Sequence, residues 1–561
     1  MLRMLLIKGS IALDNFKQNV ISILEEYKDI SILEETEHDC IVFELQKNKY
    51  GILMLDDKSF PIVVAIDNGD NYPHFMFAEL AVGTAKWRSI CLFESGTMIE
   101  YIHTEKEKIR LCIERLLGLV NLSPSEIEEE YHKEFLLYWK KYGLPAGRKN
   151  GIKYQLYLDD SQNFQWLELH KYKNNCIRIT SANRFFNDND KYMGVDITPA
   201  LYLPLDDTRG LLPPLKNKPW DAHTINDIIC GVVYQRISID AFAEIAHMSY
   251  SKREILFVFS FRDMYFGCIV EFKNPGTAKL LTKVESQITN VLPVDISRCD
   301  FEFLNGQIGN TVHNEHIVVV GAGSLGSYII DELAHSGYRN ITVVDGDLYE
   351  YANVFRHRSR FFGSALPKSQ MIEIEVSWIH PEICIHSVNQ FLSSENFDKC
   401  IPEGAHTIIF AVGSSDIQLQ INALMIGNKH KAHAIYAWLE HDGKTSHVAA
   451  VRTSKEGCFE CLFTDDEGKL CNNTVNCADP STLHLTRNGC GGTRVHYGNR
   501  TLLTASALVL NALEDDSKHN TLYSFINGAM QKRTYPQNAR CACCGIREKM
   551  HQISAAQRPY S

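Results

Sequence analysis

The sequence predicts a chain of several domains that combines α+β and α/β architecture. Its 561 residues exceed what a single hydrophobic core usually supports, since domains of about 150 residues are typical. Hydrophobic residues make up 45% of the chain and charged residues 22%, which is the composition of a globular protein and excludes wholesale disorder or a fibrous repeat. The strand and helix patterns change character along the chain and divide it into residues 1–150, 151–310 and 311–561.

The charge balance argues against nonspecific binding to polyanions. There are 57 Lys and Arg against 68 Asp and Glu, and the resulting net charge of −11 disfavours contact with nucleic acid or an anionic membrane. No run approaches the roughly 20 apolar residues of a membrane-spanning helix, and the first residues lack the cleavage pattern of a signal peptide. We therefore expect a soluble, cytoplasmic protein that binds neither nucleic acid nor membrane directly.

Residues 1–150 have the pattern of an α+β domain. A helical pattern at 12–27 is followed by four strand-like runs, and the turns between them are short enough for an antiparallel meander. The strand-like runs lie at 31–35, 39–46, 50–55 and 61–67. The segment WRSICLFES, which contains Cys91, and two helical patterns at about 104–119 and 125–140 come next. By itself, Cys91 between Ile90 and Leu92 is more typical of a core thiol than of a nucleophile.

Residues 151–310 contain mixed strand patterns and a proline-rich loop between Leu201 and Trp220. They carry no motif that indicates chemistry. We therefore interpret this region as a linker or scaffold domain.

A glycine-rich loop opens the last region. The β-branched run HIVVV leads directly into Gly321, Gly323 and Gly326, and a helical stretch and a second strand ending at Asp345 follow. Missing side chains let backbone N–H groups and a helix N-terminus approach phosphate oxygens, and Asp345 is placed to accept hydrogen bonds from ribose hydroxyls. Taken alone, this fingerprint most often indicates a nicotinamide or flavin dinucleotide, and so an oxidoreductase.

Further apolar runs continue the alternation of a doubly wound α/β domain to about Ala449. They lie at 372–379, 383–388, 406–412 and 433–439.

The residues after the second strand depart from a dehydrogenase. Asp347, Asn353, Arg356 and Lys368 follow within a short span. Two cations beside a nucleotide loop favour a triphosphate, because they can neutralise a β,γ-pyrophosphate leaving group when a carboxylate attacks the α-phosphate. The alternative is a solvated basic loop.

From Glu315 to Cys544 the chain resembles the adenylation domain of the ubiquitin-activating and ThiF/MoeB superfamily. The resemblance rests on GAGSLG, the VVDGD pair, the Asn353-x-x-Arg356 motif and Lys368. It implies that these positions bind ATP and Mg²⁺ and convert the carboxyl terminus of a ubiquitin-like protein to an acyl adenylate. The family's Asp after the next strand corresponds to Asp416, displaced here by a residue or two.

Two CxxC pairs predict a zinc site. The 17 cysteines are an odd number, and eight of them fall between Cys458 and Cys544, which fits metal ligation and thiol chemistry better than a disulfide framework. Each pair can place two thiolates on one tetrahedral ion, and the resemblance implies that the pairs form one structural Zn²⁺ site across about 80 residues. The predicted ligands are Cys458, Cys461, Cys541 and Cys544; Cys543 is an alternative ligand, and four unligated buried thiols are the other interpretation.

Three cysteines between the pairs are candidates for the acyl acceptor that the resemblance implies. They are Cys471, Cys477 and Cys490. We favour Cys490, because it lies in a glycine-rich segment shortly before a long helix, where backbone N–H groups could stabilise a thiolate. Cys477 is the second candidate.

The first region resembles a ubiquitin-conjugating enzyme. The resemblance rests on the order helix, meander, Cys91 and helices, on the ICL context of Cys91, and on Tyr72-Pro73. It implies that Cys91 is the conjugating thiol. The family's HPN-type Asn is absent, and His74 and His103 are candidates for its role.

Nearly the whole chain resembles the bacterial fusion proteins of cyclic-oligonucleotide-based anti-phage signalling systems. The resemblance implies a homodimer that adenylates the carboxyl terminus of a cGAS-like nucleotidyltransferase, forms a thioester on Cys490, transfers the acyl group to Cys91 and ligates it to a target amine. Activation of a sulfur carrier, an NAD-dependent oxidoreductase and a noncatalytic scaffold are the alternatives.

Overall fold

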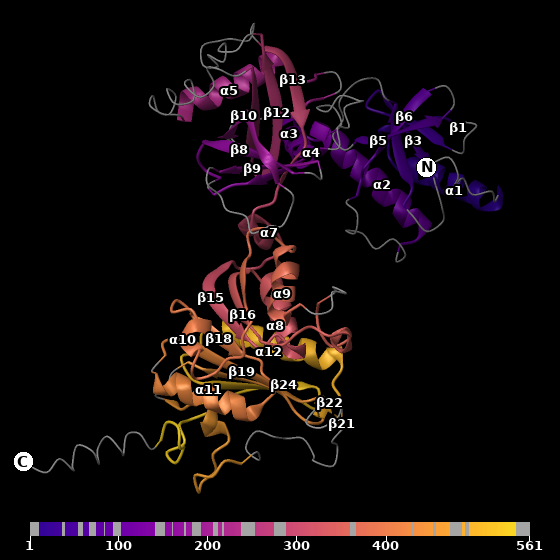
Figure 1. The fold of residues 1–561 in the computed structure, drawn as a ribbon. Coiled ribbons are helices and arrows are strands. Elements are labelled where there is room, and N and C mark those ends of the chain that lie inside the picture. The colour runs from indigo at the N-terminus through magenta and orange to yellow at the C-terminus, as the bar shows by residue number, and fades with distance from the viewer. Residues whose placement is uncertain are drawn as a thin grey trace, which may run out of the picture. The chain divides into compact units, whose positions relative to one another are not determined.

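The structure is a computed structural model (Figure 1). It describes the chain apart from the following ranges: 1–9, 36–39, 54–59, 67–74, 83–84, 94–102, 141–151, 160, 173–174, 182–191, 206–210, 216–217, 237–252, 274–287, 360–365, 429, 453–455, 472–484, 488–492 and 546–561. The chain forms two compact units, the first made of Met1–Ala182 and Tyr192–Arg298 and the second mainly of Cys299–Ser561. Each is described by itself.

The first unit begins with the predicted helix and meander. Helix α1 (Ser10–Leu24) precedes a six-stranded sheet in the order β1-β2-β3-β4-β6-β5. The first four strands pair antiparallel in sequence order, as predicted; their bounds are Ile30–Glu35, Ile41–Leu45, Asn48–Leu53 and Ile62–Ile66. Strands β5 (Phe75–Val82) and β6 (Ala85–Ile90) extend the sheet beyond the meander.

Helices α1 and α2 cover this sheet. Helix α2 (Glu105–Val120) begins in a capping box, in which Thr104 Oγ1 accepts the N–H of Glu107 and the Glu107 carboxylate accepts the N–H of Thr104. Its buried Ile109 and Ile113 join a core that also contains Phe16 of α1 and Phe43 of β2. The helix predicted at 125–140 is divided into α3 (Pro124–Lys133) and α4 (Phe135–Tyr138), because Glu134 leaves helical backbone geometry.

The second sheet of this unit has eight strands. Their order is β13-β12-β11-β10-β8-β9-β7-β14, with bounds Lys153–Tyr157 (β7), Gln165–Tyr172 (β8), Cys176–Ser181 (β9), Tyr192–Pro204 (β10), Glu254–Phe261 (β11), Met264–Phe272 (β12), Ile288–Val294 (β13) and Ile296–Arg298 (β14). Helix α5 (Ala222–Arg236) and the residues of α4 pack against it, and Phe135 and Trp139 share a buried core with Phe266. The indole of Trp139 donates to the carbonyl of Val294 at 3.2 Å. The chain that follows α3 is therefore anchored in this sheet.

The second unit is a doubly wound α/β domain, as predicted. Its sheet has the order β17-β16-β15-β18-β19-β20-β23-β24, with parallel pairing from β17 to β19 and antiparallel pairing beyond. The strands are His313–Val320 (β15), Tyr338–Val344 (β16), Cys384–Val388 (β17), Thr407–Phe410 (β18), His433–Leu439 (β19), Ser446–Val451 (β20), Thr521–Ile526 (β23) and Ala529–Thr534 (β24). The helices are Phe301–Gln307 (α7), Ser324–His335 (α8), Lys368–Ser377 (α9), Phe397–Cys400 (α10), Ser415–Gly427 (α11) and Asn499–Glu514 (α12), with one-turn helices Tyr351–Asn353 (η5) and Phe459–Leu462 (η7).

The central strands of this sheet are buried on both faces, which is why they contain continuous apolar runs, whereas β24 at the edge is exposed. Ile317 and Val319 of β15 lie in the core formed with α8, α9 and α12, whereas Val318 and Val320 lie in the core formed with α10, α11 and η7. Figure 1 shows these helices around the sheet.

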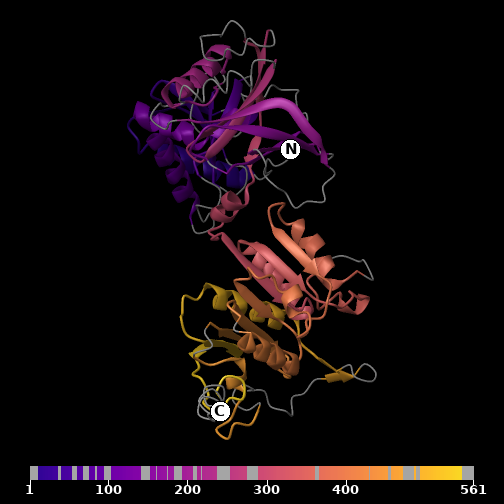
Figure 2. The same ribbon diagram turned by 60° about the vertical axis from the view of Figure 1, so that its left-hand side comes forward.

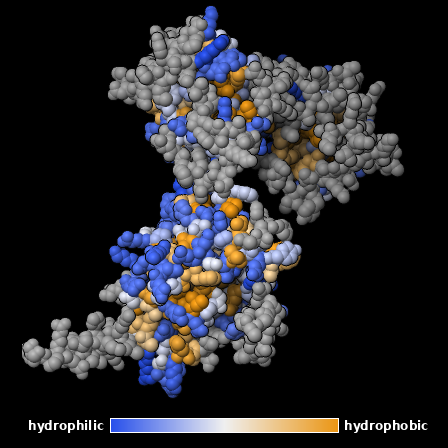
Figure 3. Space-filling model, viewed as in Figure 1, coloured by the Kyte–Doolittle hydropathy of each residue, from blue (hydrophilic) through white to orange (hydrophobic). Residues whose placement is uncertain are grey.

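No helix in the described part of the chain is long and apolar enough to cross a membrane. On the face of the second unit seen in Figure 3, hydrophilic residues are interspersed with hydrophobic ones.

Candidate nucleotide site and cysteine sites

The candidate nucleotide site lies where the strand order of the second unit reverses. Strand β15 has β16 on one side and β18 on the other, and all three are parallel. The loops that follow them therefore meet at the carboxyl edge of the sheet, which is where open α/β sheets bind ligands. The glycine loop, Asp345 and Asp416 all follow these strand ends.

Each of the three positions in the loop favours glycine for a different physical reason. Gly321 has a φ of +94°, which favours glycine, and a Cβ on Gly326 would lie 1.8 Å from the carbonyl oxygen of Gly321. A Cβ on Gly323 would meet open space. Gly323 is also the N-cap of α8, where no side chain caps the helix, so its first N–H groups are oriented as an anion site requires.

Asp345 organises the loop. One carboxylate oxygen accepts the N–H of Ala322 at 2.6 Å and the other accepts the N–H of Asp347 at 2.7 Å. Burial raises the pKa of this carboxyl group, although both backbone hydrogen bonds oppose that shift. Its predicted contact with ribose hydroxyls stays a prediction.

Arg356 contacts both Asn353 and α8. The Arg356 guanidinium donates to the Asn353 side-chain oxygen at 2.7 Å and to Ser324 Oγ at 3.3 Å. Its Nε is buried and has no hydrogen-bond partner among the residues that the structure describes. An orphaned donor beside an uncapped helix N-terminus is the arrangement that a phosphate group would complete.

Lys368 and Asp347 form an ion pair. Lys368 Nζ lies 2.6 Å from the Asp347 carboxylate, with the lysine side chain 10% exposed and the aspartate 54% exposed. The backbone N–H of Lys368 also donates to the backbone carbonyl of Asp347 at 2.9 Å. The structure thus places Lys368, the second predicted cation, beside Asp347 in the loop after β16. Asp416, by contrast, lies exposed in the first turn of α11.

Sequence reasoning missed His357. This buried residue follows Arg356, and its Nε2 lies 2.8 Å from the carbonyl oxygen of Ala322 in the glycine loop. The only sequence signal was its place in the run HRSR, which entered the sequence analysis only as part of the alternative of a solvated basic loop.

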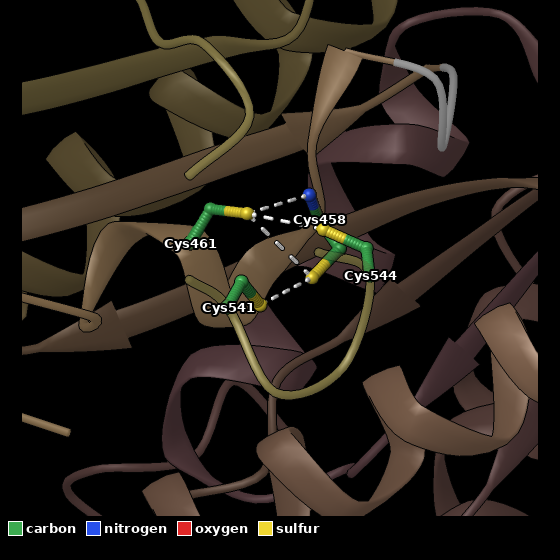
Figure 4. A group of neighbouring side chains, drawn as sticks. All are labelled: Cys458, Cys461, Cys541 and Cys544. Atoms are coloured by element: carbon green, nitrogen blue, oxygen red, sulfur yellow. Dashed lines mark hydrogen bonds between the residues drawn. The ribbon is translucent and has the colours of Figure 1, made fainter. Parts of the chain in front are cut away.

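The two CxxC pairs meet in one cluster, shown in Figure 4. The sulfur atoms of Cys458, Cys461, Cys541 and Cys544 all lie within 4.8 Å of one another, and three pairs are separated by 4.0, 3.7 and 3.3 Å. Zinc–sulfur bonds of about 2.3 Å place tetrahedral sulfurs about 3.8 Å apart, so the donor set fits a zinc ion. Cys543 is not a member of this group of four.

The surroundings of the cluster orient these thiols. The Asn422 amide donates to the sulfur of Cys458 at 3.4 Å, and the Glu460 carboxylate accepts the N–H of Cys543 at 3.1 Å. Hydrogen bonding to Cys461 and the other thiols raises the pKa of Cys458, because neighbouring thiols must share protons. A divalent cation would relieve this competition, since metal ligation deprotonates the thiols.

Cys91 lies in a cavity of about 410 Å³ in the first unit. It directly follows β6, is half-buried, and has its sulfur 3.4 Å from the carbonyl of Phe93. Arg115, Glu130, Lys133 and Glu134 are among the cavity's charged lining residues. By contrast, burial raises the pKa of both Cys40 and Cys112 to about 12, which makes these thiols unreactive core residues.

The two candidates for the activating thiol, Cys490 and Cys477, lie outside the described residues, as does His74. Cys490 falls in sequence between β21 (Leu485–Arg487) and β22 (Thr493–Val495), which pair antiparallel and project away from the eight-stranded sheet (Figure 2). The long helix predicted after it is α12. His103 is described, but it does not line the cavity of Cys91.

Residues 301–543 match the ThiF family. This part of the chain is therefore a ThiF-family domain, which confirms the resemblance to the ThiF/MoeB superfamily.

Individual relatives extend the comparison. The chain is 22% identical over 446 residues to the ATP-dependent ubiquitin transferase-like protein Cap2 of Pseudomonas aeruginosa, covering 75% of this chain and 76% of that protein. A similarity of this length reaches beyond residues 301–543 into the first unit. The sulfur carrier protein adenylyltransferase of Thermus thermophilus is 24% identical over 238 residues, which cover 41% of this chain and 82% of that enzyme. The crystal structure of E. coli MccB with MccA-N7isoASN has a TM-score of 0.33 and 16% identity, and covers 41% of this chain and 67% of that one.

Proposed function

We propose that the protein activates the carboxyl terminus of a protein with ATP and passes it through two thioesters to an amine. The observation that carries the proposal is the juxtaposition of the uncapped α8 N-terminus with the guanidinium of Arg356, whose Nε has no partner within the described part of the chain. These groups supply N–H donors and positive charge at one point, as transfer at a triphosphate requires. The similarity to Cap2 supports the same reaction class.

In the first step a carboxylate oxygen of the substrate protein attacks the α-phosphorus of ATP. A new P–O bond forms, the bond to the β-phosphate breaks, and pyrophosphate leaves with the electron pair. Arg356, Lys368 and the N–H groups of α8 would stabilise the charge on the leaving group. Magnesium, when bound, shields the phosphates, and Asp347 and Asp416 are the carboxylates proposed to hold it.

The following steps use thiolates. The Cys490 thiolate attacks the acyl adenylate and releases AMP, and the Cys91 thiolate then attacks the new thioester and releases Cys490. An amine of the target finally attacks the Cys91 thioester, forms an amide and releases the thiol. The cavity around Cys91 supports this role, since it gives the thiol an approach that is lined by both acidic and basic side chains.

We further propose that the substrate is a cGAS-like nucleotidyltransferase, that the protein acts as a homodimer in anti-phage defence in the cytoplasm, and that the Cys₄ cluster holds structural zinc. Support for the zinc comes from the spacing of the four sulfurs. Support for the defence role comes from the similarity to Cap2.

The test is ATP–pyrophosphate exchange with radiolabelled pyrophosphate. The full chain is mixed with Mg²⁺, ATP and a purified cGAS-like nucleotidyltransferase, or with the same protein lacking its last residues as a matched control. Exchange that requires the intact carboxyl terminus supports the proposal. Exchange with a small sulfur carrier protein instead would favour sulfur-carrier activation, and NAD binding without ATP binding would contradict the proposal.

A further inference from the structure

Hydrogen bonds at Ala322 hold two consecutive peptide groups of the glycine loop, the one before Ala322 and the one between Ala322 and Gly323. The carbonyl of Ala322 accepts a hydrogen bond from His357 Nε2 at 2.8 Å, while the N–H of Ala322 donates to Asp345 at 2.6 Å. Ala322 itself is fully buried. Both of its polar backbone groups are thus hydrogen-bonded, and the bond from His357 is the one that acts on the peptide between Ala322 and Gly323.

The orientation of His357 is also determined. The N–H of Ser359 donates to Nδ1 of the His357 ring at 3.1 Å, so Nδ1 is the acceptor and Nε2 carries the proton. The ring is buried and packs edge-on against Tyr349, with centroids 5.1 Å apart. The backbone N–H of His357 donates to the carbonyl of Asn353 at 2.9 Å. His357 therefore links the Asn353–Arg356 turn to the glycine loop.

A link at this carbonyl matters because of peptide geometry. In a trans peptide the C=O and N–H point in opposite directions, so the hydrogen bond at Ala322 fixes the N–H of Gly323 on the side away from His357. A glycine at position 323 can accommodate a rotated peptide without steric cost. Such a rotation would exchange the N–H for a carbonyl oxygen, which repels phosphate.

We propose that His357 is a positioning residue that holds the peptide between Ala322 and Gly323 in its phosphate-binding orientation. The inference rests on the proposed function, in which this loop binds ATP. It assigns to a neutral imidazole the task of keeping the N-terminus of α8 open to a nucleotide.

Two amide variants test this proposal in the full-length protein. In His357→Gln the side-chain amide reaches about as far as Nε2 of histidine, whereas in His357→Asn it is shorter by one methylene group. Calorimetric titration with ATP and Mg²⁺ gives the affinity, and hydrogen exchange of residues 321–326 in the nucleotide-free protein reports on the loop. His335→Asn is the matched control, because His335 ends α8 and its side chain is 54% exposed.

We expect His357→Gln to retain affinity within about 3-fold, and His357→Asn to bind ATP roughly 5- to 10-fold more weakly, as the loss of one hydrogen bond predicts. Only the Asn variant should exchange faster at 321–326. Equal loss in both variants, or wild-type affinity and exchange in the Asn variant, would overturn the proposal. If the wild-type protein does not bind ATP, the proposed function fails, and the exchange comparison alone still decides whether His357 holds the loop.

Discussion

Lys368 is the residue on which the choice between ATP and a dinucleotide depends most directly. Its charge lies, through the ion pair with Asp347, in the loop after β16, where Asp345 binds the N–H of Ala322 in the glycine loop. We predict that Lys368→Gln lowers the rate of pyrophosphate exchange by roughly 100-fold, because it removes one preorganised charge from the leaving group. Initial rates at saturating ATP measure the effect, and circular dichroism shows whether the fold is retained.

The matched control for this prediction is Lys469→Gln. Lys469 also pairs with a carboxylate, Glu467, but its side chain is 75% exposed and it lies outside the nucleotide site. An equal loss of exchange in both variants would mean that the effect is one of net charge and not of position.

His357 also predicts a pH dependence of stability. Burial lowers its pKa from 6.5 to about 4, and the nearby charges of Lys368 and Arg356 act in the same direction. Between these two pH values the unfolded chain binds a proton that the folded chain does not, so stability falls as the pH drops from 6.5 towards 4. The contribution of this one residue is at most about 3.5 kcal/mol.

This contribution should be absent from His357→Gln. Urea midpoints of the second unit at pH 7 and pH 5, measured by pulse proteolysis with mass spectrometry, should differ less in that variant than in the wild-type protein. The half-buried His316, His430 and His433, whose pKa values are also lowered, remain in both proteins and contribute to the dependence that is left. An unchanged pH dependence in the variant would show that His357 is protonated in the folded state.

At the scale of elements, strong periodicity made most of the fold predictable. The run from β15 through α8 to β16 was predicted because a β-branched strand, a glycine loop and a helical pattern follow one another without interruption. Strand β5 was missed because FMFAELAV lacks strict alternation. The helix predicted at 125–140 was interrupted because Phe135 and Trp139 are buried in the neighbouring sheet, and tertiary packing decides where such a helix ends.

Some residues of the candidate site could also be predicted from the sequence, and others could not. Gly321, Asp345 and Lys368 could be predicted because their spacing from strand ends is a property of the sequence. The contact of His357 could not, because its partner is a backbone carbonyl 35 positions away, and a carbonyl leaves no trace in residue identity. The cavity around Cys91 likewise depends on how α2 and α3 pack.

The cluster of four cysteines predicts that the second unit binds zinc and depends on it for stability. We expect about one zinc ion per chain by elemental analysis, because four thiolates complete a tetrahedral site. Removal of zinc by a chelator, or the substitution Cys541→Ser, should lower the free energy of unfolding of the second unit by several kcal/mol, since metal binding contributes directly to folding. Urea denaturation with and without chelator measures the difference.

Cys543→Ser is the control for the zinc site. Cys543 is the neighbouring thiol outside the group of four, so its substitution should leave the zinc content unchanged. A metal-free protein of full stability would contradict the prediction, and loss of zinc on substitution of Cys543 instead of Cys544 would reassign one ligand.

For the whole molecule, the two thiols predict an order of events. Cys490→Ala should form the adenylate and no thioester, whereas Cys91→Ala should accumulate a thioester on Cys490 and yield no amide product. Nonreducing gels of the full chain with ATP, Mg²⁺ and the nucleotidyltransferase distinguish these species. The thioester bands should disappear on reduction, because a thiol exchanges with the acyl group.

Cys471→Ala serves as the control for the relay, since Cys471 belongs to the same region and has no proposed role. A thioester that persists in Cys490→Ala and is lost in Cys477→Ala would transfer the activating role to Cys477. Normal conjugation by Cys91→Ala would show that the first unit does not carry the acyl group.

The return of the chain to its own sheet has a consequence for how the protein can be divided. After β20 the chain leaves the eight-stranded sheet, and it comes back at β23, which pairs with β20 so that Val448 faces Tyr523. Residues 472–484 lie within this excursion. Suppose that the chain is divided within 472–484 into two polypeptides. They would still form one continuous sheet, pack through α12, and each contribute two of the four cysteine sulfurs. Coexpressed as separate genes, they should elute as one particle from a sizing column and separate only in denaturant.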